Sequence, residues 1–438
     1  MQVPLDYSQP AGRRISLALM RLPVKDQSRR IGSVLMNPGG PGGSGIDFLR
    51  RDATKYFQDL NSRMDLVTWD PRGVGASTPV KCLDDAQLDK YLALDTVIDD
   101  AQEERAWVDA SRNFAIGCER NSASLLPFMD SDSTARDMDS IRAALGDARL
   151  TYIGFSYGTY IGQWYAHLFP THVRALALDG VVDSADTGRA SALEQFASFQ
   201  QNLEAFLADC RAHATCEYGR SGDPAAKLDA LMARLDKTPI AVGSRQLTRT
   251  LAMDAVLASM YNQNSWPKLQ LALAVTEGGD GRGMLAIADS WNERKADGTY
   301  DNFMNGAHAA TACIEGFQHP RQIEFSDPIA AQIEKASPFF GPSLEWDGLY
   351  CAFWPELPRP YRQLTIAGAP PILLIGATND PATPYQWAKS VSQEIAKSVL
   401  LTRVGNGHTS YFFSGCITAA ENAYLENLTL PSAGASCS

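Results

Sequence analysis

The chain has 438 residues, of which 45% are hydrophobic and 20% are charged, which is ordinary for a globular protein with a large core. Its formal net charge of -11 argues against nucleic acid or an anionic membrane surface as a partner. No segment approaches the roughly 18 consecutive apolar residues of a membrane-spanning helix, and no internal repeat is visible.

The N-terminal third predicts a series of strands and helices. Residues 14–21 alternate between polar and apolar, as a strand with one exposed face does. Apolar segments at 31–36 and 65–69 are further strand candidates, and 133–145 is predicted as a helix that ends at Gly146. This alternation of strands and helices favours a mostly parallel sheet covered by helices.

A glycine-rich loop, residues 37–45 (NPGGPGGSG), follows the second of these strands. A nucleotide-binding loop is one interpretation, but no Lys-Ser or Lys-Thr closes the loop and the glycines do not fit G-x-G-x-x-G. We favour half of an oxyanion hole, because bare backbone can approach a substrate closely there. The predicted donor is the amide of Gly40.

The most informative segment is 154–158 (GFSYG), which matches the G-x-S-x-G pattern of the nucleophile elbow in serine hydrolases. A β-rich apolar run at 150–153 precedes it, and apolar residues at helical spacing follow it at 159–169. A strand, a sharp turn and a helix are what this pattern requires. We therefore predict Ser156 as the nucleophile and the amide of Tyr157 as the second oxyanion donor.

The pattern changes after a further predicted strand at 175–178. Helical periodicity dominates from about 184 to 349, and a strand signal returns at 371–376. A helical block that interrupts such a sheet is typical of a cap, which excludes water and shapes a substrate pocket. We predict an α/β-hydrolase core formed by 1–183 and 350–438, with a mainly helical cap at 184–349 between its two parts.

Two residues near the C-terminus complete a catalytic set. A serine hydroxyl needs a base, usually a histidine that a carboxylate holds in the right tautomer. Asp380 lies in a loop after a predicted strand, and His408 lies in a glycine-rich loop about one helix and one strand later. The chain order Ser, Asp, His is that of α/β-hydrolases, so we predict Ser156, Asp380 and His408 as a triad. The alternatives are a solvated turn residue for Asp380 and a surface histidine for His408.

The chain contains eight cysteines and six histidines, which do not cluster as zinc ligands, and no C-x-x-C pair occurs. The simplest pairing joins neighbours: Cys82–Cys118, Cys210–Cys216, Cys313–Cys351 and Cys416–Cys437. Four bridges would imply an oxidising compartment and a secreted protein, whereas the alternative is a cytosolic enzyme with free thiols. Met1 runs directly into Gln-Val-Pro-Leu-Asp, so we expect that an export signal was removed and a start methionine added.

These segments together resemble the tripeptidyl aminopeptidase and proline iminopeptidase branch of the α/β-hydrolase fold. The matching stretches are spread over most of the chain: 3–7, 37–42, 70–75, the elbow and 380–384. Proline iminopeptidases usually carry a histidine where this chain has Pro38, so the tripeptidyl group is the closer match. The resemblance implies a secreted serine peptidase that releases short peptides from a free N-terminus. It implies the same triad and oxyanion donors, and no cofactor.

An aminopeptidase must also bind the ammonium group of its substrate, usually with carboxylates of the cap. Glu315 is our candidate, because a bridge from Cys313 could fix it near the boundary with the core at Cys351. The alternative is an ordinary surface glutamate. Trp354 would line the pocket, or else belong to the core.

Two other functions remain open at this point. The same triad would serve an esterase or small-amide hydrolase, because the fold does not determine the substrate. A catalytically inactive hydrolase fold that acts as a binding module is the other, and the complete Ser, Asp and His set argues against it. No metal or cofactor is predicted, the partner is a peptide or small molecule, and the oligomeric state is left open.

Overall fold

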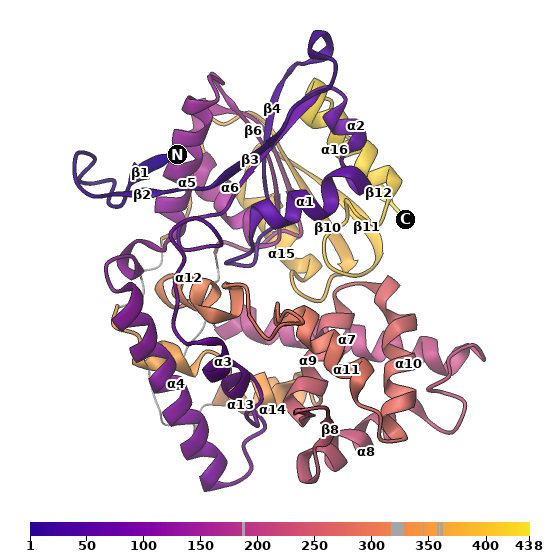
Figure 1. The fold of residues 1–438 in the computed structure, drawn as a ribbon. Helices are drawn as coiled ribbons and strands as arrows, with labels where there is room; N and C mark the ends of the chain where they lie inside the picture. Colours follow the sequence, from indigo (N-terminus) through magenta and orange to yellow (C-terminus); the bar gives the residue numbers. More distant parts are fainter. Residues whose placement is uncertain (186–188, 317–327, 345, 357–358, 360–361) are drawn as a thin grey trace.

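The computed structural model describes residues 1–185, 189–316, 328–344, 346–356, 359 and 362–438 (Figure 1). Its centre is an eight-stranded sheet with the strand order β12-β11-β10-β7-β6-β4-β5-β3. The strands are β3 (Leu19–Leu22), β4 (Gly32–Asn37), β5 (Met64–Trp69), β6 (Leu150–Phe155), β7 (Val173–Asp179), β10 (Ile372–Asn379), β11 (Ser398–Asn406) and β12 (Ser436–Cys437). All pairs in this sheet are parallel except β3 with β5, which confirms the predicted fold class.

Helices cover both faces of the sheet (Figure 1). One face packs against α5 (Ser131–Ala144), α6 (Tyr157–Leu168) and α15 (Tyr385–Glu394), and the other against α1 (Gly45–Tyr56), α2 (Gln58–Asn61) and α16 (Gly415–Asn427). In β6, Tyr152 packs with the first group, whereas Ile153 and Phe155 pack with the second. Successive side chains of a strand point to opposite faces, so a fully buried strand such as β6 has cover on both sides.

The strand predicted at 14–21 is divided in the structure. β2 (Arg14–Ser16) pairs with β1 (Gln2–Pro4), whereas β3 joins the main sheet beside β5. At the division the amide of Leu17 donates to Met1 O and the amide of Ala18 donates to Ser77 Oγ, each at 2.8 Å. The sequence did not reveal this division, because polar and apolar residues alternate in β2 and in β3 alike. Such an alternation does not depend on which strand is the partner.

A helical half lies beyond the carboxyl ends of the strands (Figure 1). Between β7 and β10 the described elements are α7 (Arg189–Ala212), α8 (Pro224–Lys237), β8 (Ile240–Val242), β9 (Arg245–Leu247), α9 (Arg249–Met260), η4 (Gln263–Ser265), α10 (Trp266–Glu277), α11 (Arg282–Trp291), η5 (Phe303–Ala307), α12 (His308–Glu315), α13 (Pro328–Ala336), α14 (Gly341–Leu344) and η6 (Leu349–Phe353). Residues of α7 to α11 form a hydrophobic cluster of their own.

Two helices from before β6, α3 (Asp85–Leu92) and α4 (Ala101–Ser122), also lie in this helical half (Figure 1). The indole of Trp107 in α4 donates to Trp346 O at 3.1 Å, and the ring of Phe114 lies 5.3 Å from that of Tyr350. Sequence analysis did not assign α3 and α4 to the cap, because the contacts that hold them there join residues more than 200 positions apart. The boundaries of the cap at 183/184 and 349/350 stay a prediction.

Four disulfides join neighbouring cysteines, in the pairing of the simplest scheme: Cys82–Cys118, Cys210–Cys216, Cys313–Cys351 and Cys416–Cys437. The third of these ties α12 to η6, and the fourth ties α16 to β12 at the edge of the sheet. Disulfides persist in oxidising compartments, so this set indicates an extracellular protein. Within the described part of the chain, no helix has both the length and the apolarity needed to cross a bilayer.

Candidate active site

Ser156 lies at the sharp turn between β6 and α6. Its backbone has φ 56° and ψ -127°, which is a strained conformation for a residue with a side chain. The turn closes tightly, because a Cβ on Gly154 would stand 2.5 Å from Gly158 O. The amide of Ser156 donates to Asp179 O at 2.9 Å, which ties the turn to the end of the neighbouring strand β7. The strand, turn and helix that the G-x-S-x-G pattern requires are all present.

Asp380 and His408 are in direct contact. Nδ1 of His408 lies 2.8 Å from Oδ1 and 3.1 Å from Oδ2 of Asp380, whose side chain is fully buried. The carboxylate also accepts hydrogen bonds from the amides of Ala382 and Thr383 at Oδ1 and of Thr409 at Oδ2. An ionised carboxylate only accepts, so we assign the ring proton to Nδ1.

The other ring nitrogen of His408 is then an acceptor. Nε2 is buried and has no hydrogen-bond partner among the described residues. A buried acceptor without a donor is rare in proteins and marks a position where a donor is expected to arrive. A neutral imidazole with a free Nε2 and a carboxylate behind Nδ1 is the arrangement of a general base.

Sheet topology explains why residues so far apart in sequence meet. β6, β7 and β10 are adjacent and parallel, with Asp179 opposite both Phe155 and Ile375. Their carboxyl ends therefore lie at one edge of the sheet. Asp179 binds the amide of Ser156, and a Cβ on the next residue, Gly180, would stand 3.2 Å from Cε1 of His408. The segment after β7 thus lies between the backbone of the serine and the ring of the histidine.

Asp179 is a residue that sequence analysis missed. Its Oδ2 accepts the amide hydrogens of Ser410 at 2.7 Å and Tyr411 at 2.8 Å, two and three residues after His408. The side chain is fully buried, and burial raises its pKa to about 6. Through its carbonyl and its carboxylate, Asp179 joins the turn of Ser156 to the loop of His408. The signal available in the sequence was an aspartate at the end of an apolar strand.

The glycine-rich loop after β4 passes directly over the elbow. A Cβ on Gly39 would stand 2.4 Å from Phe155 O, 2.9 Å from Cβ of Ser156 and 3.0 Å from the amide nitrogen of Tyr157. Gly39 has φ +96°, a conformation that favours glycine. Gly40, the predicted donor, follows it immediately. The residue that precedes Gly40 is therefore in close contact with Ser156 and with the amide of Tyr157, the other predicted oxyanion donor.

Glu315 is the last residue of α12 and is partly buried. Its carboxylate accepts a hydrogen bond from the amide of Ser131 at the start of α5. Burial raises the pKa of Glu315 to about 7, and the charge of Asp130 adds to this effect. Burial raises the pKa of the Tyr157 hydroxyl, and the negative charge of Glu315 raises it further. Tyr157 is the residue after the predicted nucleophile. Glu315 is thus enclosed by protein near the elbow.

Trp354 is buried in a hydrophobic cluster that also contains Tyr157 and Tyr160. Its ring centroid lies 6.5 Å from that of Tyr350. The indole Nε1 is buried and has no hydrogen-bond partner among the described residues. The side chain packs in the core near the elbow, and its role in lining a pocket stays a prediction.

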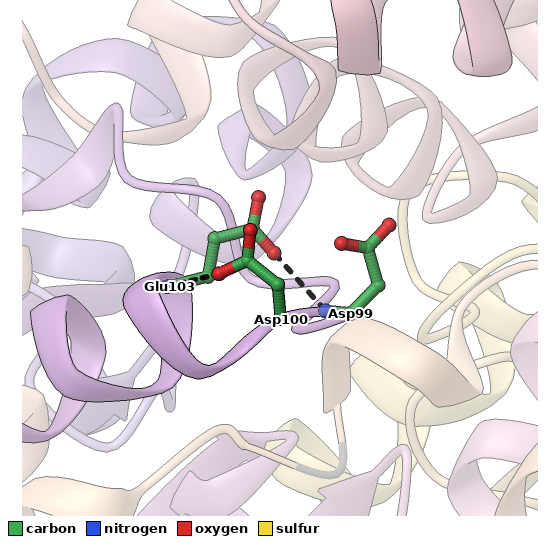
Figure 2. A group of neighbouring side chains, drawn as sticks. All are labelled: Asp99, Asp100 and Glu103. Carbon is green, nitrogen blue, oxygen red and sulfur yellow. Dashed lines mark hydrogen bonds between the residues drawn. The ribbon is translucent and has the colours of Figure 1, made fainter.

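One group of acidic side chains could in principle hold a metal ion, consisting of Asp99, Asp100 and Glu103 (Figure 2). Asp100 is the N-cap of α4, and its Oδ1 accepts the amide hydrogens of Gln102 and Glu103. Glu103 in turn accepts from the amide of Asp99. These carboxylates are largely exposed, and they satisfy amides at a helix start, where negative charge is favourable. Helix capping explains the group without a metal.

The chain is similar to curated proteins over almost all of its length, and a family model matches its C-terminal part. A family model described as TAP-like protein matches residues 337–437. The serine protease Hip1 of Mycobacterium tuberculosis is 34% identical over 463 residues, covering 100% of this chain and 86% of the relative. The tripeptidyl aminopeptidase of Streptomyces coelicolor is 32% identical over 438 residues, covering 97% and 79%. Carboxylesterase B of M. tuberculosis is 34% identical over 459 residues, covering 100% and 85%.

Proposed function

We propose that this chain, which belongs to the TAP-like family of α/β-hydrolases and is a serine hydrolase, releases short peptides, three residues long, from the free N-terminus of peptide substrates. The observation that supports this most is the contact of His408 Nδ1 with the buried Asp380 carboxylate at 2.8 Å, at the sheet edge where Ser156 lies. The names of two relatives, a serine protease and a tripeptidyl aminopeptidase, favour a peptide over an ester substrate.

The proposed reaction proceeds through an acyl-enzyme. Ser156 Oγ attacks the scissile carbonyl carbon, while Nε2 of His408 takes the hydroxyl proton and then gives it to the leaving amine. A water molecule attacks the acyl-enzyme with His408 again as the base, and this releases the short peptide and regenerates the serine. Asp380 holds the ring in the tautomer with its proton on Nδ1 and stabilises the imidazolium that forms.

The amides of Gly40 and Tyr157 are proposed to bind the oxyanion of the tetrahedral intermediate. This assignment is supported by the path of the loop at Gly39, whose backbone is in contact with Ser156 and the amide of Tyr157. Such donors act on the charge that develops in the transition state, and the loss of one typically costs about 10²–10³ in kcat.

Replacing Gly39 with alanine is expected to lower the rate at which Ser156 reacts with a fluorophosphonate by about 100-fold. The added Cβ would collide with Phe155 O and with Ser156, so the loop and the amide of Gly40 must move. The matched control is Gly146→Ala, because Gly146 has φ +76° and no atom within 4 Å of an added Cβ. Both variants carry a similar backbone strain, and only Gly39→Ala should lose reactivity; equal rates would contradict the proposed role of the loop.

Glu315 is proposed to bind the ammonium group of the substrate, with Trp354 as part of the wall nearby. Glu315 is partly accessible and close to the elbow, and burial raises the pKa of its carboxyl to about 7, so a counter-charge would stabilise its ionised form. An ammonium group would supply that charge and replace the lost hydration. A carboxylate as desolvated as that of Glu315 would bind a charged N-terminus much more strongly than a blocked one.

The variant Glu315→Gln is expected to reduce kcat/KM for a free N-terminus by about 10–100-fold relative to an N-acetylated substrate. For the wild type, this ratio of kcat/KM should rise with pH through about 7 as Glu315 ionises, since kcat/KM reports the free enzyme. The ratio should fall again above about 8, where the α-amino group loses its proton. In Glu315→Gln the rise near pH 7 should vanish. Glu334→Gln, an exposed change of the same type, should behave as the wild type.

The function itself is tested with a tripeptide linked to aminomethylcoumarin, compared with its N-acetylated form, and with mass spectrometry of the products. Cleavage of only the free form, with the intact tripeptide as the product, is the expected result. Release of single residues would make the enzyme an aminopeptidase of another type.

A carboxylesterase is the second candidate, because a relative with that name is 34% identical over its aligned length. Equal cleavage of the free and the acetylated substrate, together with faster cleavage of simple esters, would favour it. We propose that either enzyme acts outside the cell, which the four disulfides support.

A further inference from the structure

The loop that carries His408 has an unusual backbone. Gly407, before the histidine, has φ 106°, and Thr409, after it, has φ 65°. A positive φ is a marked exception for a β-branched residue and persists only where the surrounding structure fixes it. Because Thr409 follows the proposed base directly, the groups that fix its backbone also determine where the ring of His408 points.

The amide hydrogens of this loop are bound by two carboxylates and one carbonyl. Oδ2 of Asp380 accepts from the amide of Thr409 at 3.0 Å, and Oδ2 of Asp179 accepts from the amide of residue 410 at 2.7 Å. The amide of His408 donates to Tyr261 O at 2.8 Å. Each of these consecutive amides is therefore bound by a different segment of the chain.

The carbonyl oxygens of the same loop converge on one side chain, that of Arg403 in β11. Its Nη2 donates to Gly407 O at 2.8 Å, and to Asn406 O and Thr409 O at 3.1 Å each. Its Nε donates to Oγ of Ser410 at 3.3 Å. Two of these carbonyls belong to the residues that flank the proposed base, so a single nitrogen binds the backbone on either side of it.

The guanidinium of Arg403 is enclosed by protein, since the residue is only 5% exposed. A Cβ on Gly405 would stand 2.8 Å from Nη1, and the ring centroid of Phe413 lies 5.2 Å from Cζ. Burial lowers the pKa of Arg403, whereas the charges of Asp179 and Asp380 raise it. A buried cation is costly unless it is paired and hydrogen-bonded. Here the loop carbonyls and the two carboxylates offset that cost.

We propose that Arg403 is a positioning residue for the hydrolase reaction, which holds the loop of His408 so that the ring stays on Asp380 and Nε2 stays available to Ser156. The inference rests on the proposed roles of the triad, and it does not depend on the identity of the substrate. The loop can turn only if its amides leave the carboxylates and its carbonyls leave the guanidinium. A lysine would hold it less well, because an ammonium is a point charge on a flexible stem, whereas the guanidinium is a planar fork with five donors.

The test measures the rate at which a fluorophosphonate labels Ser156, because that reaction needs the base and can be run without knowing the natural substrate. Arg403→Met is expected to lower the rate by about 100-fold, since a misplacement of about 1 Å in an active site can cost that much. Arg403→Lys keeps the charge and part of the hydrogen bonding, so it should recover about tenfold of this loss.

The matched control is Arg174→Met. Arg174 lies in β7, and its guanidinium also binds two backbone carbonyls, those of Leu425 at 2.6 Å and Glu426 at 2.8 Å. Burial lowers the pKa of Arg174 as well. Its partners are at the end of α16 and not in the loop of His408. Arg174→Met should therefore keep the wild-type labelling rate, even where a thermal melt shows a similar loss of stability.

A second measurement separates the positioning of His408 from general support of the fold. In the background of His408→Ala the base is absent, so the addition of Arg403→Met should lower the labelling rate no further. Residues that act through one another are non-additive in this way, whereas the effects of independent residues multiply. If Arg403→Met does not fold, the same comparison is made with Arg403→Lys.

An equal loss from the change at Arg403 with and without His408 would overturn the positioning role and leave the triad intact, as would a wild-type rate in Arg403→Met. Labelling of His408→Ala at the wild-type rate would instead contradict the proposed base, and with it the role of Arg403. These results are distinct, because the first two concern only Arg403 and the last concerns His408 alone.

Discussion

Replacing Ser156 with alanine is expected to lower kcat by about 10⁶-fold, since the members of a triad act as a unit. Alanine leaves the backbone turn at φ 56° and the hydrogen bond from its amide to Asp179 O in place, so thermal unfolding should change little. What remains would be the weak catalysis that an oxyanion hole and substrate binding provide.

The measurement is the release of aminomethylcoumarin from the free tripeptide substrate, run beside labelling with a fluorophosphonate and a thermal melt. Ser8→Ala, an exposed change far from the elbow in sequence, is the control and should match the wild type. Turnover or labelling that survives in Ser156→Ala would show that another residue is the nucleophile, whatever the melt reports.

Replacing Asp380 with asparagine is expected to lower kcat by about 10⁴-fold with little change in KM. The amides of Ala382 and Thr383 hold the oxygen of residue 380 at the Oδ1 position, so the NH₂ group takes the Oδ2 position, which in the wild type is 3.1 Å from Nδ1 of His408 and accepts from the amide of Thr409. An NH₂ group donates to Nδ1, which stabilises the tautomer with the proton on Nε2. The ring then has no acceptor for the hydroxyl proton of Ser156.

Asp179→Asn is the comparison that isolates this effect. Asp179 is as buried as Asp380 and belongs to the same loop network, but its Oδ2 binds the amides of Ser410 and Tyr411 and not the ring. Asparagine keeps one oxygen for those amides, so the loss in kcat should be much smaller than for Asp380→Asn. Equal losses would mean that support of the loop, and not control of the tautomer, is the role of Asp380.

Three carboxylates between β7 and β10, one of which is the proposed ammonium ligand Glu315, share one property. Burial raises the pKa of Asp254, Glu293 and Glu315 to about 7, so each is held in a site that disfavours its charge. Desolvated acids of this kind are costly for the fold and are concentrated at functional sites. For Glu315, the ammonium group of a substrate would relieve that cost, which is the physical basis of the proposed binding.

The fold, and candidates for the central residues of the site, were within reach of the sequence. The elbow depends on neighbours in the chain: an apolar strand, small residues around Ser156 and a helix at once after it. Asp380 and His408 could be found because each follows a strand in a short polar or glycine-rich loop, and because six histidines leave few choices. The nearest-neighbour pairing of the cysteines likewise needed only their positions.

Other parts of the site depend on contacts that no local pattern encodes. Asp179 had the appearance of an ordinary strand end, and its two roles arise because β7 lies between β6 and β10. The division of the predicted strand at 14–21 follows from a change of partner, and α3 and α4 reach the helical half through residues far away in sequence.

By itself, the sequence determined the α/β sheet, the elbow at Ser156, the order of the triad candidates and the serine hydrolase class, because these depend on short-range periodicity and on turns. Only the tertiary structure decided which polar groups lose their water. The raised pKa of Glu315 comes from atoms of remote segments packed around it. Desolvation is a sum over everything nearby in space, and spacing along the chain does not carry that information.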